Sequence, residues 1–334
     1  MAADTSTLQP TTLQHLATAV YPSFAMLAGM QLDVFTPLNE GSLTAAQLAD
    51  TLSVNAEKLS RLLYALVTAN FLTVEGDRFA NTPEAQQFLV KGKPTYLGGR
   101  HENFSEVWEA LLHTAETIRT GVPQCKKDFA TLSPDAQLPF FRGLHPRTMA
   151  AGRDLASRYD FSAYRTLADV GGGSGGMALA LTDVYPHLRA TVIDLPTVTP
   201  ITQQFLAEAG AADRVQVIAA DVVSAPVPGT YDVAVVRALL QVLSPEHALQ
   251  ALTHIGAALH PGGCLYIVGS ILDDGRLSPL GAVGFNLVAL NEFDEGRAYT
   301  EGEYCAWLTA AGFVEIARVV IAEGASIMTA RKPV

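Results

Sequence analysis

The chain has 334 residues, a formal net charge of −11, 49% apolar residues and 16% charged residues. This length and apolar content predict a folded protein with two sizeable cores and exclude a disordered chain. The negative charge argues against general binding to nucleic acid or to anionic membranes. The three cysteines, Cys125, Cys264 and Cys305, form no CxxC pair, which favours a reduced cytoplasmic protein over a disulfide framework.

The first thirty residues and the apolar runs of the chain bear on secretion and on membrane insertion. The first thirty residues contain no Lys or Arg, whereas a secretory signal begins with positive charge. No uncharged apolar run approaches the roughly 20 residues that span a bilayer. We therefore expect a cytoplasmic protein without a membrane partner. No spacing of His, Cys, Asp and Glu indicates a metal site.

Residues 1–100 have the pattern of a winged helix. Apolar residues recur at three- and four-residue steps over 12–36, which predicts a helix. Thr44 can cap the next helix, and Asn55 starts a further one. Residues 71–82 then read as two short strands around a Glu-Gly-Asp turn.

A winged helix raises the hypothesis of a DNA-binding regulator. Residues 1–100 hold six basic and eight acidic side chains, and the second helix of the motif offers only Lys58 and Arg61. A footprint on phosphates needs more positive charge than this. We expect a packing or dimer-forming role for this domain, with the regulator as the least favoured alternative.

Residues 101–162 are predicted to be a helical linker that helps to wall a substrate pocket. The segment is rich in aromatic residues and histidine, and Pro and Gly predict breaks at 120–124 and 141–148. Most of the aromatic residues are expected in the core. His101 and His145 are candidates for the pocket, and either of them, or Tyr21, is a candidate to act there as a catalytic base.

Residues 163–334 alternate between strand and helix, which predicts a doubly wound, mostly parallel α/β sheet. Predicted helices span 175–186, 198–210, 245–263 and 300–313. Predicted strands span 166–172, 189–196, 214–223, 231–240, 264–272, 314–322 and 325–331.

The stretch ADVGGGSGG, residues 168–176, joins the first of these strands to its helix. Glycines permit positive φ and close approach of a ligand, and a helix N-terminus favours negative groups. The spacing is ambiguous. Gly171, Gly173 and Gly176 satisfy the dinucleotide pattern GxGxxG, and Gly171, Gly173 and Gly175 satisfy the GxGxG of S-adenosylmethionine enzymes.

Two carboxylates follow the next two strands. Asp194 in TVIDLP can accept both hydroxyls of a ribose, and Asp221 in IAADVV can accept from an adenine amino group, with Val222 against the ring. In a doubly wound sheet the carboxyl ends of these strands meet at one crevice. The glycine turn and both acids are therefore expected at a single nucleotide site.

With LHPGG at 259–263 and AAGF at 310–313, these motifs resemble the two-domain S-adenosylmethionine-dependent small-molecule O-methyltransferases of plant and bacterial natural-product pathways. The resemblance spans about 15–331. It implies a Rossmann-like methyltransferase domain behind an N-terminal winged-helix domain that forms a homodimer. It also implies cofactor contacts at Gly171, Gly173, Asp194, Asp221, Val222 and Arg237, and S-adenosylhomocysteine as product.

The chain departs from this family at the catalytic base. Aligned on Arg237, Ser244 and Glu246, the position of the family's histidine holds Gln241. The two flanking glutamates of the family fall at Gly269 in IVGSIL and at Ala298 in GRAYT. Phe285 and Asn286, which precede GRAYT, are further pocket candidates.

The sequence predicts methyl transfer to a small, aromatic or polycyclic acceptor, achieved by proximity and orientation. A general base contributes about 10²–10⁴-fold, whereas orientation reaches effective molarities of about 10⁵–10⁸ M. Gln241 can orient an acceptor but cannot serve as a base. The alternative is a cyclase, decarboxylase or hydroxylase-like enzyme on the same scaffold, in which the cofactor or its product is bound but not consumed.

Overall fold

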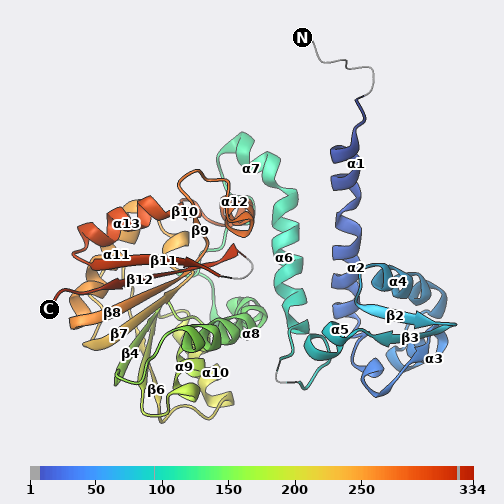
Figure 1. Ribbon diagram of the computed structural model, residues 1–334, viewed down its shortest axis with the longest axis horizontal. Helices are drawn as coiled ribbons and strands as arrows, with labels where there is room; N and C mark the ends of the chain where they lie inside the picture. The colour runs from blue at the N-terminus through green and yellow to red at the C-terminus, as the bar shows by residue number, and fades with distance from the viewer. Residues whose placement is uncertain (1–7, 94, 322–323) are drawn as a thin grey trace. The chain divides into compact units, whose positions relative to one another are not determined.

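The computed structural model describes residues 8–93, 95–321 and 324–334 (Figure 1). The chain divides into two units, one that extends to Ser105 and one that spans Glu106–Val334. The division falls inside helix α6 (His101–Leu112). The three-part division at 100 and 162 stays a prediction.

The first unit has the winged-helix order of elements. Its helices are α1 (Thr11–Thr18), α2 (Val20–Gln31), η2 (Pro37–Glu40), α3 (Ala45–Leu52), α4 (Ala56–Thr68), α5 (Pro83–Phe88) and η3 (Gly98–Arg100). Its strands β1 (Leu43–Thr44), β2 (Leu72–Glu75) and β3 (Arg78–Asn81) form an antiparallel sheet in the order β1-β3-β2.

Local capping explains where the two central helices of this unit begin. Thr44 Oγ1 accepts from the N–H of Gln47 at 3.2 Å, and Gln47 Oε1 accepts from the N–H of Thr44 at 3.0 Å. This capping box starts α3. Asn55 Oδ1 accepts from the N–H of Lys58 at 2.9 Å and starts α4. Both predicted helix starts are confirmed.

The predicted helix over residues 12–36 is two helices, α1 and α2, separated at Ala19. Helix α1 buries none of its residues within its unit. Leucines 13 and 16 of α1 and Val20 of α2 are exposed. Only some of the apolar residues whose spacing predicted one helix are therefore buried in the core of this unit.

The second unit begins with helical segments: the rest of α6, then α7 (Thr114–Thr120) and α8 (Pro134–Arg158). The predicted break at 120–124 is confirmed, and the break at 141–148 is wrong because α8 continues through Pro139 and Pro146. A proline inside a helix costs about 3 kcal/mol. Close packing on α9 (Gly176–Val184) offsets this cost, since a Cβ on Gly152 would lie 2.6 Å from the Cβ of Ala180.

A seven-stranded sheet forms the centre of the second unit, in the order β11-β12-β8-β7-β4-β5-β6. Strand β12 runs antiparallel to both neighbours, and the pairs among β6, β5, β4, β7 and β8 are parallel. The predicted fold class is confirmed. The strands are β4 (Thr166–Val170), β5 (Arg189–Asp194), β6 (Val215–Ala219), β7 (Tyr231–Arg237), β8 (Leu259–Gly269), β11 (Val314–Val320) and β12 (Ser326–Arg331).

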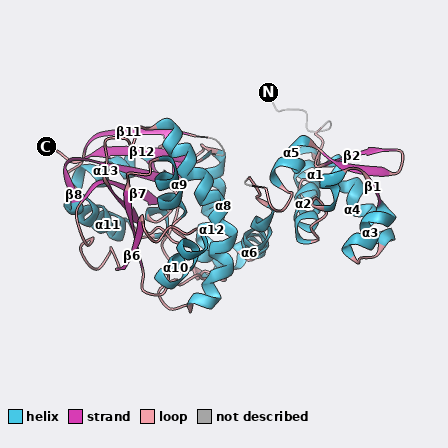
Figure 2. Cartoon of the chain, turned by 90° about the horizontal axis from the view of Figure 1, so that it is seen from below, coloured by secondary structure: helices cyan, strands magenta, loops and turns pink. Residues whose placement is uncertain are grey.

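Helices cover both faces of this sheet (Figure 2). They are α8, α9, α10 (Thr199–Glu208), α11 (Pro245–Ala258) and α13 (Glu301–Ala310). Helix α12 (Leu280–Glu292) packs instead against α7 and β9 (Ile271–Leu272). Strand β4 shows why two cores exist, because successive side chains point to opposite faces. Leu167 packs in a cluster with α9 residues, and Ala168 and Val170 pack in the other cluster, with α11 residues.

Element boundaries differ from the prediction near the end of the chain. The helix predicted over 245–263 ends at Ala258, and 259–263 opens strand β8. The strand predicted over 264–272 ends at Gly269 and is followed by β9 (Ile271–Leu272), which pairs with β10 (Tyr299–Thr300). The strand predicted over 314–322 runs to Val320, and residue 322 lies outside the described residues.

Candidate functional site

The order of the strands creates a crevice at the carboxyl end of β4. Strand β4 lies between β5 and β7, so the chain leaves the centre of the sheet first toward β5 and β6 and later toward β7 and β8. Ligands of doubly wound sheets bind at such a switch point, beyond the carboxyl ends of the strands. The loops after β4, β5, β6 and β7 are therefore the candidate site.

The glycine loop after β4 requires glycine at three positions. Gly171, Gly173 and Gly175 have φ values of +66°, +57° and +73°, which favour glycine. Gly176 has no positive φ and begins α9, where a Cβ would lie 3.0 Å from the Cβ of Thr148. The left-handed set is thus the GxGxG alternative, and Gly176 serves the packing of α9 on α8.

Asp194 is the last residue of β5, and it forms hydrogen bonds with the segments that follow β4 and β6. Its Oδ2 accepts from the N–H of Gly173 at 2.7 Å, and its Oδ1 accepts from the N–H of Leu195 at 2.7 Å. Its carbonyl accepts from the N–H of Ala220, beyond β6, at 2.9 Å. Burial raises the pKa of Asp194 to about 6, against the lowering effect of the two N–H donors. The structure thus brings Gly173 and Asp194 together as expected.

Asp221 and Val222 follow β6 in a tight turn. Asp221 Oδ1 accepts from the N–H of Val223 at 3.0 Å, and its carbonyl accepts from the N–H of Ala225 at 3.0 Å. Val222 is buried, and its carbonyl lies 2.8 Å from Nδ1 of His254 on α11. This turn is therefore held by its own backbone N–H groups and by His254 of α11, with Asp221 just beyond the end of β6.

Asp169 is a buried acid under the glycine loop that our sequence analysis did not single out. Its Oδ2 accepts from the N–H of Ala178 in α9 at 3.0 Å, and its Oδ1 has no hydrogen-bond partner among the described residues. Burial raises the pKa of Asp169 to about 7, against the lowering effects of the Ala178 N–H and of Arg237. The sequence feature that could have identified Asp169 is its place in ADVGGG, two residues before Gly171.

Gln241, the residue predicted in place of the base, lies in the turn η4 (Leu240–Val242) after β7. The Gln241 side chain is buried, and its Oε1 accepts from the N–H of Ser270 at 2.8 Å. A Cβ on Gly269 would lie 2.7 Å from that oxygen. A Cβ on Gly296, two residues before Ala298, would lie 2.9 Å from the Gln241 carbonyl.

Phe285 and Asn286 of α12 lie near Ala298. Asn286 Oδ1 accepts from the N–H of Ala298 at 2.8 Å. Phe285 packs against a small apolar cluster that contains the buried Ala298 and Leu272. The two residues therefore support the chain at Ala298. Whether they also contact an acceptor stays a prediction.

The two histidine candidates occupy different places in the chain. His101 begins α6 in the first unit, and its carbonyl accepts from Ser105 Oγ at 2.8 Å. His145 lies within α8 in the second unit, with Nδ1 2.8 Å from Ser174 Oγ of the glycine loop. His145 is therefore placed beside the glycine loop.

Helix α8 also brings an aromatic cluster to the loop. A Cβ on Gly173 would lie 2.6 Å from the Phe141 ring. The rings of Phe129, Phe140 and Phe141 lie 5.2–5.9 Å apart, centroid to centroid. Most aromatic residues of this segment were expected in the core, and the helix break predicted at 141–148 gave no indication that Phe141 packs against Gly173.

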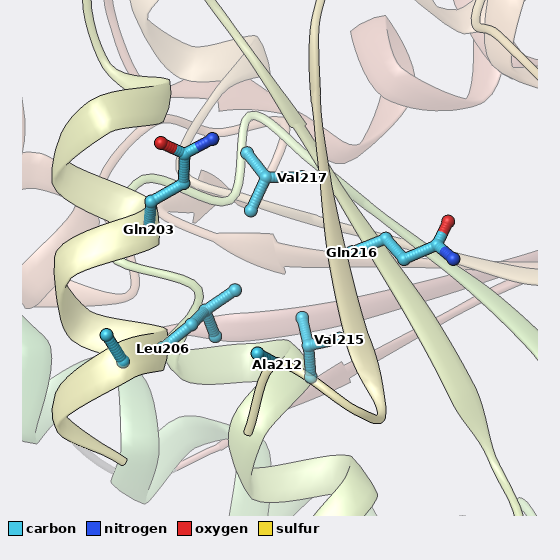
Figure 3. Close-up of a pocket in the computed structure, with 7 residues that line it drawn as sticks. Gln203, Leu206, Ala212, Val215, Gln216 and Val217 are labelled. Atoms are coloured by element: carbon cyan, nitrogen blue, oxygen red, sulfur yellow. The ribbon is translucent and has the colours of Figure 1, made fainter. Parts of the chain in front are cut away.

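A pocket shown in Figure 3 lies elsewhere, between α10 and the edge strand β6. Its lining includes Gln203, Leu206, Val215 and Val217. Val215 pairs with Ala190 near the start of β5, at the end of the sheet opposite to Asp194. This pocket is therefore separate from the candidate site.

Comparison with known proteins matches both parts of the chain. Residues 119–314 match the O-methyltransferase domain, and residues 14–91 match the O-methyltransferase dimerisation domain. Within the described ranges, no helix is both long and apolar enough to cross a membrane.

Two Streptomyces enzymes and one solved structure illustrate the similarity. The tetracenomycin polyketide synthesis 8-O-methyl transferase TcmO of Streptomyces glaucescens is 30% identical over 330 residues, which cover 97% of each chain. The 3-hydroxy-5-methyl-1-naphthoate 3-O-methyltransferase of Streptomyces sahachiroi is 30% identical over 317 residues, 93% of this chain and 91% of that enzyme.

The structure of human N-acetylserotonin methyltransferase in complex with SAM has the same fold, with a TM-score of 0.84 at 23% identity over 98% of this chain and 99% of that one. The expected resemblance and fold class are confirmed, and so are the reaction and cofactor class of the family. The chain belongs to the O-methyltransferase family, whose members transfer a methyl group from S-adenosylmethionine to small acceptors.

Proposed function

We propose that this protein methylates an acidic hydroxyl group on a small aromatic or polycyclic metabolite. The acceptors named for TcmO and for the naphthoate 3-O-methyltransferase, a polyketide and a hydroxynaphthoate, support this class of acceptor. The single observation that carries the proposal is the replacement of the base constellation by Gln241, Gly269 and Ala298. An acceptor that ionises readily does not need a general base.

The residues at the strand ends fit a nucleoside cofactor. The left-handed glycines 171, 173 and 175 leave the backbone of the loop without side chains, and Asp194 offers a carboxylate at the end of the next strand. Asp221, Val222 and Arg237 would complete the contacts. S-adenosylmethionine, when bound, supplies an electrophilic methyl group. A Cβ at these glycines would also be strained, which supports a backbone-lined cradle.

Gln241 would act by orientation. Its Oε1 accepts from the N–H of Ser270, which fixes the orientation of the amide. The two N–H donors of the amide are then left for another acceptor. Such donors suit a phenolate or enolate oxygen, which accepts hydrogen bonds strongly. An amide cannot remove a proton near neutral pH. The acceptor would therefore arrive ionised or lose its proton to water, at a cost within the about 10²–10⁴-fold that a base usually contributes.

We also propose that the protein is a homodimer formed through the first unit. The match to the dimerisation domain supports this. So does the set of exposed apolar side chains on α1 and α2: Leu13, Leu16, Val20 and Tyr21. A second copy would cover such a row of apolar residues.

A methylation assay tests the proposal. Purified protein is incubated with S-adenosylmethionine and a panel of hydroxynaphthoates, phenols of graded pKa and aromatic amines, and products are analysed by mass spectrometry. We expect a gain of one methyl group on the more acidic hydroxyl compounds and simultaneous formation of S-adenosylhomocysteine.

The second candidate is an enzyme that binds the cofactor without consuming it, and the missing base favours it too. The same assay separates the two functions. Conversion of an acceptor without S-adenosylhomocysteine would support the second candidate. Tight cofactor binding with no methylation across the panel would contradict the first.

A further inference from the structure

Helix α8 contacts the glycine loop through a polar pair that cofactor binding alone does not explain. His145 Nδ1 lies 2.8 Å from Ser174 Oγ. Ser174 stands in the sequence between Gly173 and Gly175, which both have left-handed backbone conformations. Ser174 is buried, at 3% exposure. A buried hydroxyl needs a partner, since leaving it unpaired costs about 1–3 kcal/mol.

The His145 ring is itself held in place. It stacks on Phe205 of α10, with centroids 4.4 Å apart and an interplanar angle of 24°. Arg142, one turn earlier on α8, makes a bidentate ion pair with Glu208 at 2.7 and 3.2 Å, and its guanidinium lies 5.3 Å from the Phe205 ring. The imidazole is thus held between α8 and α10, and its Nδ1 faces the glycine loop.

The charge state of the imidazole agrees with this arrangement. Burial lowers the pKa of His145 to about 4, with Glu208 raising it and Arg142 and Arg153 lowering it further. The ring is therefore neutral near pH 7. In the neutral ring Nδ1 either donates to Ser174 Oγ or accepts from its hydroxyl, according to the tautomer, and either arrangement gives one hydrogen bond.

The same loop is tied to the proposed cofactor carboxylate. Gly173 donates its N–H to Asp194 Oδ2 at 2.7 Å, and its carbonyl accepts from Thr202 Oγ1 of α10 at 2.6 Å. We infer that His145 is a positioning residue: through Ser174 it holds the glycine loop in the conformation that sets Gly173 against Asp194 for nucleoside binding. This inference rests on the proposed cofactor site.

Two substitutions separate the hydrogen bond from the packing. His145→Phe keeps an aromatic ring for Phe205 and removes the hydrogen bond. His145→Asn loses the ring and keeps a polar atom near the position of Nδ1. If the hydrogen bond positions the loop, S-adenosylhomocysteine binds His145→Asn within about threefold of wild type and binds His145→Phe about tenfold more weakly, the loss expected for one buried hydrogen bond. The reverse order would overturn the inference and leave His145 a packing residue.

Hydrogen exchange in the unliganded protein provides a readout that does not depend on the cofactor. We expect the amides of residues 172–176 to exchange about tenfold faster in His145→Phe and in Ser174→Ala, and at the wild-type rate in His145→Asn. Unchanged exchange in both His145→Phe and Ser174→Ala would contradict the inference. Failure of the wild-type protein to bind S-adenosylhomocysteine would instead contradict the proposed function, with the exchange result still deciding the role of His145.

Discussion

The side-chain oxygen of Gln241 lies where a side chain on Gly269 would begin: a Cβ there would be 2.7 Å from Gln241 Oε1. The family resemblance of the sequence implies a histidine and a glutamate at these two positions. Gln241 Oε1 accepts from the N–H of Ser270, so a side chain on residue 269 would have to share space with this hydrogen bond. The Gln241 side chain and the absence of a side chain at residue 269 are thus linked by packing in the turn after β7.

This relationship predicts the stability of Gly269→Ala. The added methyl group would push Gln241 off the Ser270 N–H, so we expect a loss of about 1–3 kcal/mol in the free energy of unfolding, measured with urea. Gln241→Ala should relieve the clash, so the double variant should be less destabilised than the two single losses together. Gly275→Ala is the control, because a Cβ there meets nothing within 4 Å. Additive losses would show that the two positions do not interact.

The role of Gln241 in turnover can be separated from its role in the turn. Gln241→Glu keeps an oxygen for the N–H of Ser270 but removes the two N–H donors. If those donors hold an ionised acceptor, Gln241→Ala and Gln241→Glu should both lower kcat/KM by about tenfold or more. If Gln241 only satisfies Ser270, Gln241→Glu should keep wild-type activity. A loss beyond 10³-fold in Gln241→Ala would mean that the residue does more than orient.

Asp169 gives a prediction for pH dependence. Its pKa is raised to about 7 in the folded protein from an ordinary 3.8. Between these values the unfolded chain has already lost the proton, so raising the pH favours unfolding and lowers stability. We expect the wild-type free energy of unfolding to fall, relative to that of Asp169→Asn, by about 1–4 kcal/mol from pH 4 to pH 7. Parallel pH profiles for the two proteins would refute this assignment.

The apolar row on α1 and α2 predicts the state of assembly. Leu13→Glu with Leu16→Glu places charge on side chains that are 70% and 61% exposed within their own unit. We expect the pair of substitutions to convert a dimer into monomers in light scattering. Leu277→Glu, at an 81% exposed site in the second unit, is the matched control and should leave the dimer intact. A wild-type protein that is already monomeric would disprove the proposed dimer.

Local patterns predicted most of the fold. Capping residues such as Thr44 and Asn55, and the alternation of strand and helix after residue 163, carry their information within a few positions. The helix α8 could not be predicted as one piece, because its prolines forbid helix locally and only packing against α9 overrides them. Helix α12 and the β9–β10 pair were not predicted either. Both depend on contacts between segments that are distant in the sequence.

The candidate site divides in the same way. The glycine loop, Asp194 and Asp221 were predictable because each directly follows a predicted strand. The contact of His145 with Ser174 was not, since 29 residues and a mispredicted helix separate them. The closeness of Gln241 Oε1 to Gly269 was not predictable either. The sequence shows which side chains are absent from these positions, but not which atoms occupy the space.

Binding of S-adenosylhomocysteine to wild type and to Asp194→Asn, measured by calorimetry at pH 7.5, tests the central claim most directly. At that pH the carboxyl group, with a pKa of about 6, is ionised. We predict one site per chain in the wild type and a loss of about 10–100-fold in affinity in the variant, the cost of a hydrogen bond to a charged group. No binding to the wild-type protein, or equal affinity in the two proteins, would contradict a nucleoside site at the ends of these strands.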